Sequence, residues 1–366
     1  MSPAEGSVAA KNADGTIRYA YIDGTTQWPM VGALNGASVP LPGKPAPASA
    51  IAIVPSGDNG LHIVWQAADK ILFVSQRADR SFGTVYTFGV PPLEGTFPLT
   101  AINVHDPTIA IGPTGDVAIA FAYEVSENGV AYQPPRIAVA HGTAQAGNIV
   151  FGALEVASPG CCVSEWDEVA HTISGPSLAI GPDGATHVVY EWSSNFDTIV
   201  EYTHNRTGQF AAPIEVSRAA FVPCPSLAVD ANGAYVTFLV EPNRRVFYVS
   251  IIDDVVSEHM VLYESSDYIT MSMMARDATG NVHVAVQETT AAGGRLLYLK
   301  LPPFSDEPEL VEPTEITLME SPGFVELTPR AGGFTVTDAG DLLFGYERVP
   351  TWNEMGQAEV AFRLAE

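Results

Sequence analysis

Two segments of the chain bring together residues that could carry chemistry. Residues 158–175 read SPGCCVSEWDEVAHTISG, with acids beside an indole and an imidazole, and residues 102–107 read INVHDP, with a histidine next to an aspartate. Carboxylates and imidazoles serve as general acids and bases, and an aromatic ring beside carboxylates suits a carbohydrate. The candidate ligand-binding residues in these segments are His105, Asp106, Glu165, Trp166, Asp167, Glu168 and His171.

Acidic and basic residues also recur where the second predicted strand of a repeat ends and the third begins. Short-range ion pairs are expected there, and at an exposed rim such pairs are structural and contribute under ~1 kcal/mol each. The functional alternative is a polar ring around a channel mouth that binds a hydroxylated ligand or a cation. The candidates at these positions and in the loops beside them are Glu124, Arg136, Glu191, Trp192, Arg245, Glu347 and Trp352.

The three cysteines form an unusual local pattern, because Cys161 and Cys162 are adjacent and Cys224 follows at a distance. Adjacent cysteines can close a vicinal disulfide, one of them can pair with Cys224, or the thiolates can bind a soft metal with His105 or His171. A structural disulfide in an exported protein is the favoured interpretation. No CxxC or HxxxH spacing supports a metal, and we expect neither a metal nor a cofactor.

A repeated unit must position these residues. The phrases DPTIAIGPTGDVAIAFAYE, GPSLAIGPDGATHVVYEW and CPSLAVDANGAYVTFLVE paraphrase one another, and looser copies span the rest of the chain. Each has period-two alternation on both sides of a glycine-containing turn, which predicts a β-hairpin. His62, His187 and His283 occupy one position of this repeat, which indicates a role in the scaffold.

Two further strands follow most hairpins, so each repeat predicts a four-stranded blade. The turn glycines recur about every 54 residues, a spacing typical of propeller blades. We therefore predict an all-β propeller of seven blades, formed as a single domain by residues 1–366. The alternative is six blades, in which residues 17–28 supply the third and fourth strands of the last blade.

This fold sorts the loops onto two faces. The turns within hairpins lie on one face, and the connections between blades lie on the other, where the long segments 90–107, 123–136, 158–175 and 347–358 fall. Long loops on a rigid scaffold are common places for binding and catalysis. The predicted site is therefore on that second face, near the third and fourth blades.

The phrase PSLAxDxxGxxHVVY is similar to repeats of bacterial propellers grouped with the sialidases, and the resemblance covers most of the chain. It implies a sialidase-like scaffold. The sialidase Asp box is present only in part, in IDGTTQW, and the Phe/Tyr-Arg-Ile-Pro motif is not found. The arginine triad and the Tyr/Glu pair of sialidases are therefore not assigned to residues.

The charge of the chain restricts its partners. With 17 basic and 42 acidic residues among 366, the formal net charge is −25, which repels nucleic acid and anionic lipid. No apolar run approaches the roughly 20 residues of a membrane span, and MSPAEGSVAA has no apolar secretory core. We expect a secreted or periplasmic bacterial protein whose signal peptide has been removed, and a monomer.

Two classes of function fit these features. The favoured one is a recognition module that binds a glycan or a protein partner on the loop-bearing face. The alternative is a polysaccharide-active enzyme, a hydrolase or a lyase, that uses acids and histidines on the same face. Motifs of the GxSxG, Walker A, GxGxxG and HExxH types are not found, so no catalytic residue is named. Soft-metal binding by Cys161, Cys162 and Cys224 is a second alternative.

Overall fold

The computed structural model shows a molecule built of β-strands. It describes residues 4–34, 36–43, 47–91, 99–127, 130–145, 148–158, 172–193, 198–219, 225–240, 244–277, 279–290, 293–301, 314–316, 324–327, 333–337, 342–344 and 346–349. Every regular element in these ranges is a strand. The prediction of an all-β fold is confirmed.

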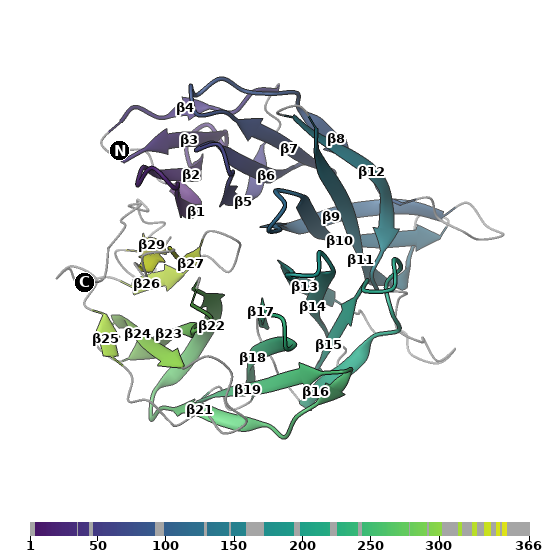
Figure 1. Ribbon diagram of the computed structural model, residues 1–366, viewed down its shortest axis with the longest axis vertical. Helices are drawn as coiled ribbons and strands as arrows, with labels where there is room; N and C mark the ends of the chain where they lie inside the picture. Colours follow the sequence, from purple (N-terminus) through teal and green to yellow (C-terminus); the bar gives the residue numbers. More distant parts are fainter. Residues whose placement is uncertain are drawn as a thin grey trace.

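Six sheets stand around a common centre and form blades 1 to 6, numbered in chain order (Figure 1). Within each sheet the strands follow one another from the centre outwards and pair antiparallel. Blade 1 contains β1 (Ala4–Lys11), β2 (Ile17–Asp23), β3 (Pro29–Ala33) and β4 (Val39–Pro40); blade 2 contains β5 (Ala48–Pro55), β6 (Leu61–Ala67), β7 (Lys70–Gln76) and β8 (Tyr86–Phe88); blade 3 contains β9 (Leu99–Ile111), β10 (Val117–Glu127), β11 (Val130–Gln145) and β12 (Asn148–Val156).

The second half of the ring repeats this arrangement. Blade 5 has a fifth strand, because β20 and β21 both pair with β19. Blade 4 contains β13 (Thr172–Ile180), β14 (Thr186–Ser193), β15 (Thr198–His204) and β16 (Ile214–Ala219); blade 5 contains β17 (Ser226–Val229), β18 (Ala234–Val240), β19 (Arg245–Ile252), β20 (Val255–Val256) and β21 (Met260–Glu264); blade 6 contains β22 (Tyr268–Arg276), β23 (Val282–Thr290), β24 (Gly293–Leu301) and β25 (Thr314–Ile316).

The last repeat forms two smaller sheets. β27 (Phe334–Val336) pairs with β28 (Leu342–Phe344), and β26 (Phe324–Leu327) pairs with β29 (Tyr346–Val349). These strands contact β22 of blade 6 and β1 of blade 1, so they fill the place between the two ends of the ring. The propeller is confirmed, and complete blades number six in the described residues, as in the alternative count. The reasoning for that alternative is wrong, however, because residues 17–23 form the second strand of blade 1.

The hairpin turns explain the repeated glycines. In blade 4, Gly184 has a φ of +81° and donates its N–H to the carbonyl of Gly181 at 3.0 Å. Gly15, Gly115 and Gly280 have the same left-handed backbone in their own turns. Glycine reaches this region without a steric penalty, so each hairpin can reverse in a few residues and send its second strand back beside the first.

The core lies between blades instead of at one centre. Successive side chains of a strand point to opposite faces of its sheet, so β14 sends Val188 and Tyr190 towards blade 3 and Val189 towards blade 5. Each pair of neighbouring blades shares such an apolar cluster. A blade is therefore stable only against its neighbours.

The innermost strands are also fastened to one another. The hydroxyl of Ser177 on β13 accepts the backbone N–H of Leu227 on β17 at 3.1 Å, and Ser226 on β17 accepts that of Met274 on β22 at 2.8 Å. These are the serines of the repeated PSLA phrase. The phrase therefore encodes a contact from one blade to the next around the centre.

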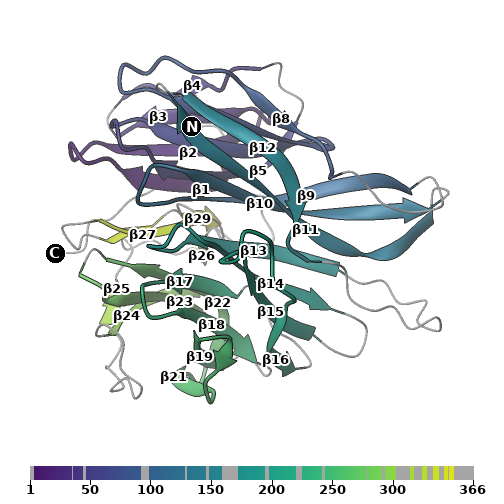
Figure 2. The same cartoon turned by 45° about the vertical axis from the view of Figure 1, so that its right-hand side comes forward.

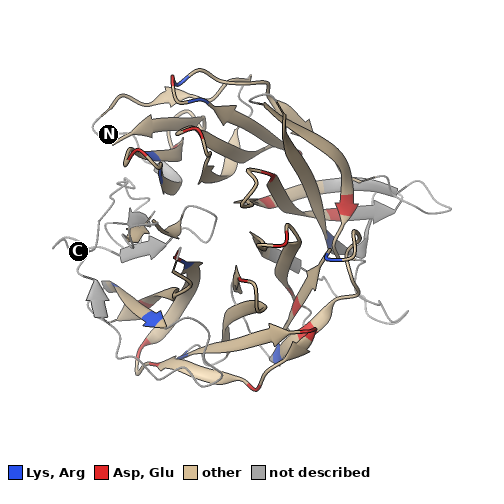
Figure 3. Ribbon diagram, in the orientation of Figure 1, with Lys and Arg blue, Asp and Glu red and all other residues tan. Residues whose placement is uncertain are grey.

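The two faces of the ring differ in the segments they carry. We call "turn face" the one with the hairpin turns of the two inner strands and the turns that follow each third strand, and "loop face" the opposite one (Figure 2). On the turn face, Arg18 of blade 1 donates to the carbonyls of Arg77 and Ala78 in blade 2, at 3.4 and 3.3 Å. Figure 3 shows that the hairpin turns around the centre carry many of the acidic residues.

Candidate functional site

A central channel of about 500 Å³ passes between the innermost strands of the blades. Its wall is made mainly of small and aliphatic residues of β5, β9, β13, β17 and β22. Among the described residues that line it, the charged ones are Asp106 and Arg276. Asp106 is the lining residue of β9 furthest from its hairpin turn, so it lies at the loop-face end, whereas Arg276 closes β22 at the turn face.

Asp106 forms the polar centre of the loop-face mouth together with its neighbour in sequence. Its Oδ2 lies 2.9 Å from Nδ1 of His105, and both side chains are partly open to solvent, with 28% and 20% exposed. A carboxylate on one ring nitrogen fixes the orientation of an imidazole and leaves Nε2 directed elsewhere. Asp106 can therefore offer a hydrogen-bond acceptor to a ligand in the channel, and it holds the imidazole of His105 beside it.

The backbone at Asp106 is strained. Its φ is +52°, and it precedes Pro107 at an irregularity in the pairing of β9 with β10. The matching place in blade 4 is Gly175, which precedes Pro176 and has a φ of +47°. Glycine adopts this backbone freely, whereas a residue with a Cβ meets a steric penalty there, which is smallest for Asn and Asp. Strained positions are often found at functional sites, so Asp106 stays a candidate ligand-binding residue.

The junction of blades 3 and 4 contains further polar and aromatic groups, outward from the channel wall. His105 lies opposite Ala122 in the ladder, and Ala122 packs in one cluster with Tyr190 and the partly buried Trp192 of blade 4. The Tyr190 hydroxyl donates to Oε2 of Glu201 on β15 at 2.8 Å. Burial raises the pKa of Glu201, although hydrogen bonds from Tyr190 and Trp192 oppose that shift. A carboxyl with a raised pKa can stay protonated at weakly acidic pH and donate a proton.

Some predicted residues lie at the rim of blade 3 and blade 4 as expected. Glu124 is half-buried on β10 opposite Asn103, and Glu191 is half-buried on β14 opposite Val200. Arg136 on β11 lies opposite Tyr123, whose pKa is raised by burial and lowered in part by the charge of Arg136. None of the three lines the channel, and their predicted contact with a ligand stays a prediction.

Other predicted pairs have different partners. Arg245 binds Glu264 of β21 at 2.8 Å on the exposed edge of blade 5, far from the channel in the order of the strands. Glu347 lies on β29 opposite Glu326, so its expected place at the end of a second strand is wrong. A pair between a second and a third strand does occur in blade 6, where Glu288 binds Arg295.

The remaining candidates lie outside the described residues. They are Cys161, Cys162, Glu165, Trp166, Asp167, Glu168, His171, Cys224 and Trp352. In the part of the chain that the structure describes, no group of three or more His, Cys, Asp or Glu could hold a metal ion. The same part contains no helix that could span a membrane.

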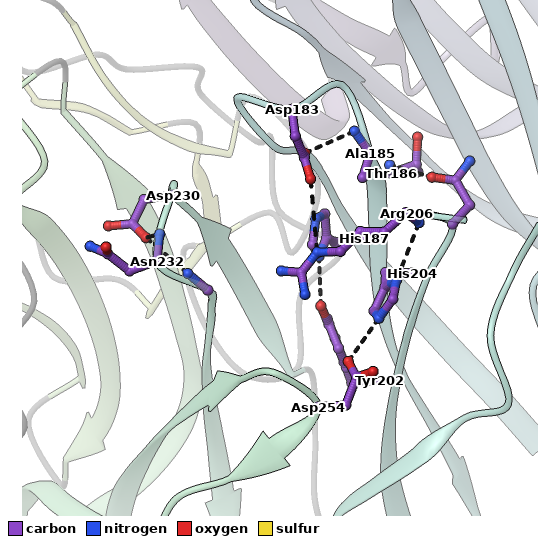
Figure 4. A network of polar contacts seen from close by, with 12 residues as sticks. Asp183, Ala185, Thr186, His187, Tyr202, His204, Arg206, Asp230, Asn232 and Asp254 are labelled. Carbon is purple, nitrogen blue, oxygen red and sulfur yellow. Dashed lines mark hydrogen bonds and ion pairs between the residues drawn. The ribbon is translucent and has the colours of Figure 1, made fainter. Parts of the chain in front are cut away.

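The repeated histidines His62, His187 and His283 are buried, and Figure 4 shows His187 next to Tyr202. His187 contacts the Tyr202 hydroxyl with Nδ1 at 2.6 Å, and His283 contacts Tyr298 in the same way at 2.6 Å. His62 contacts Ser75. Burial lowers the pKa of His62 and of His187 to about 4, so both rings are neutral at pH 7. Their place fits the role in the scaffold that the repeat predicts.

Sequence reasoning missed Glu201 and Tyr190. In the alternating sequence of β15, Glu201 has the position of an ordinary strand residue. Its neighbour in the ladder is Tyr190, which belongs to β14. The burial of Glu201 arises only in the folded protein. The raised pKa therefore has no signal in the local sequence.

The fold and the channel define a β-propeller. No protein-family model matches the sequence, and no curated protein matches it. Solved structures share the fold. A puromycin-hydrolysing peptidase from Mycobacterium tuberculosis is 14% identical with a TM-score of 0.56, and the match covers 99% of this chain and 54% of the peptidase. This chain thus spans about half the length of that protein.

Two further solved structures are of proteins whose names describe an action on carbohydrates. A Hadza microbial sialidase is 10% identical with a TM-score of 0.53, over 96% of this chain and 73% of the sialidase. The polysaccharide lyase Uly1 is 11% identical with a TM-score of 0.50, over 80% of this chain and 76% of the lyase. At these identities the likeness shows a common propeller scaffold.

Proposed function

We propose that this chain is an exported propeller that binds a glycan at the loop-face mouth of its channel, between blades 3 and 4. The observation that carries the proposal is the strained Asp106, which lines the channel and holds His105 at 2.9 Å. A carboxylate and an imidazole can hydrogen-bond to sugar hydroxyls, and a concave, mostly apolar wall with a few polar groups is typical of ligand sites.

The electrostatics support a neutral or hydroxylated ligand. The net charge of −25 disfavours polyanions, and the acid at the mouth would repel an anionic group that approached from the loop face. The partly buried Trp192 adds an aromatic side chain at the same junction. The predicted loop residues Glu165, Trp166, Asp167, Glu168 and His171 belong to the connection into blade 4, so they enter the proposal as additional contacts.

A second candidate function is cleavage of the bound polysaccharide. It is favoured by the oriented imidazole of His105, because an imidazole held by a carboxylate is a common general base in enzymes. The same samples therefore need an assay of turnover.

The proposal is tested with three variants on an oligosaccharide array, followed by calorimetric titration of the best ligand. Asp106→Gly and His105→Gln are expected to weaken binding at least tenfold, since a hydrogen bond to a charged group is worth about 1.5–3 kcal/mol. Asp254→Asn, at an exposed turn of the opposite face, is the matched control and is expected to bind like the parent.

Each outcome has a defined meaning. Unchanged oligosaccharide binding by Asp106→Gly would show that the channel mouth is not the binding site. Release of reducing ends or unsaturated products by the parent, lost in His105→Gln, would establish the enzymatic function in place of simple recognition.

A further inference from the structure

A separate apolar pocket lies on the loop face between blades 1 and 2. It has a volume of about 130 Å³, and all of its lining residues are uncharged. The loop between β2 and β3 and the connection from β4 to β5 provide one side, and β6 and β7 provide the other. Its lining includes Trp28, Pro29, Pro40, Pro42, Trp65 and Leu72. We call it the Trp28 pocket.

The loop that presents Trp28 is held from both blades. Gln27 has a φ of +56°; its N–H donates to the carbonyl of Asp23 at 2.6 Å, and its carbonyl accepts the N–H of Ala48 in blade 2 at 2.9 Å. The Asp23 carboxylate in turn accepts the N–H groups of Thr25 and Thr26. A strained residue persists only where its surroundings fix it. The indole is therefore pre-organised, which lowers the entropic cost of binding.

The indole remains available to a ligand. Trp28 is 41% exposed, whereas Trp65 in the same pocket is 3% exposed. The exposed part of the Trp28 ring is at the edge of the apolar pocket, where a bound ligand could contact it. The pocket thus combines one open aromatic ring with a buried one and a wall of prolines.

This chemistry selects an uncharged ring. An ionic ligand would find no counter-charge among the lining residues, and a ligand with buried polar groups would leave them without hydrogen bonds. A pyranose avoids both problems, because it can place a C–H face on the indole and keep its hydroxyls in water at the open side. The volume suits one such ring.

We infer that the Trp28 pocket is a second carbohydrate subsite, which binds one neutral pyranose unit by stacking on Trp28. The choice of ligand rests on the proposed function, whereas the location rests on the pocket itself. Both sites lie on the loop face, so one polysaccharide chain could occupy them together. Two linked contacts raise the apparent affinity through effective concentration.

The test measures the binding of neutral β-linked hexasaccharides, cellohexaose, xylohexaose and mannohexaose, by calorimetry. Trp28→Ala is expected to weaken binding about thirtyfold, since aromatic anchors are the dominant contacts of binding sites. Val255→Ala removes another exposed apolar side chain, 68% exposed on blade 5, and is expected to bind like the parent. Near-parent thermal stability of Trp28→Ala would exclude unfolding as the cause, and Trp28→Phe is expected to recover part of the affinity.

The variants separate this inference from the proposed function. If Asp106→Gly loses binding and Trp28→Ala keeps it, the inference is wrong and the channel mouth stands. If Trp28→Ala loses binding and Asp106→Gly keeps it, the inference stands and the channel mouth falls. Binding of a proline-rich peptide at Trp28 with no binding of any hexasaccharide would also overturn it, because the pocket would then serve a protein partner.

Discussion

Two residues, Asp106 and His187, show how single positions depart from the repeat or keep to it. Asp106 stands at a backbone position that glycine fills in blade 4, and it adds a carboxylate to the channel at the cost of local strain. His187 keeps the position of the repeat, and its burial makes the neutral ring necessary. The departure at Asp106 is the basis of the proposed ligand site, whereas the repeated position of His187 fits a role in the scaffold.

The buried histidine predicts how stability depends on pH. His187 has a pKa of about 4 in the folded protein and an ordinary value of 6.5, so its contribution is present above pH 6.5 and is lost as the pH falls towards 4. By linkage the loss at pH 4 is about 3 kcal/mol at most. Urea unfolding of His187→Gln and the parent at pH 7.5, 5.5 and 4 measures it. The variant should lose less stability on acidification, and parallel curves would show that the ring is not the cause.

The turn glycines predict a second effect at this scale. Gly184→Ala should cost about 1–2 kcal/mol, because its φ of +81° disfavours a Cβ although no atom lies within 4 Å of it. Gly57→Ala is the matched control, since Gly57 also has open space and no left-handed backbone. Chemical denaturation compares them. Equal stability of the two variants would refute the role given to the backbone.

At the scale of elements, blades are joined by side chains that reach across their junctions. Glu288 on β23 is fully buried, accepts the Tyr263 hydroxyl of blade 5 at 2.6 Å and binds Arg295 of its own blade. Burial raises the pKa of Glu288, but hydrogen bonds from Ser265, Tyr263 and Arg295 outweigh it and leave the pKa lowered. The carboxylate therefore stays charged between blades 5 and 6.

Removing its counter-charge should be costly. Arg295→Met leaves a buried carboxylate without its cation and is expected to destabilise the fold by about 3–5 kcal/mol. Arg245→Met breaks the pair with Glu264, whose side chains are 52% and 59% exposed, and is expected to cost less than about 1 kcal/mol. Thermal and urea unfolding compare the two variants. A loss of stability below about 1 kcal/mol in both would contradict the role given to the pair of Glu288 and Arg295.

These junctions also explain what could be predicted from the sequence. The hairpins, the propeller and the pair His105–Asp106 follow from local patterns, because alternation, turn glycines and adjacent residues are visible in a single segment. The Tyr263 partner of Glu288 is on another blade, and the raised pKa of Glu201 depends on burial that its own strand does not reveal. The Trp28 pocket also joins three separate segments. Contacts between blades are set by the ring, so no single repeat contains them.

The whole molecule is an acidic ring with two unlike faces. The turn face carries a dense network of hydrogen bonds, with His204 donating from Nε2 to Asp254 at 2.8 Å while its Nδ1 accepts the N–H of Arg206 at 3.2 Å. The loop face carries the mouth with Asp106 and the Trp28 pocket. We therefore assign a structural role to the turn face and ligand binding to the loop face.

The most direct test of that assignment is a crystal structure of the protein with a bound oligosaccharide identified on the array. We expect a sugar at the loop-face end of the channel, with a hydroxyl within hydrogen-bond distance of the Asp106 carboxylate. A ligand bound on the turn face, with an empty channel mouth, would contradict it.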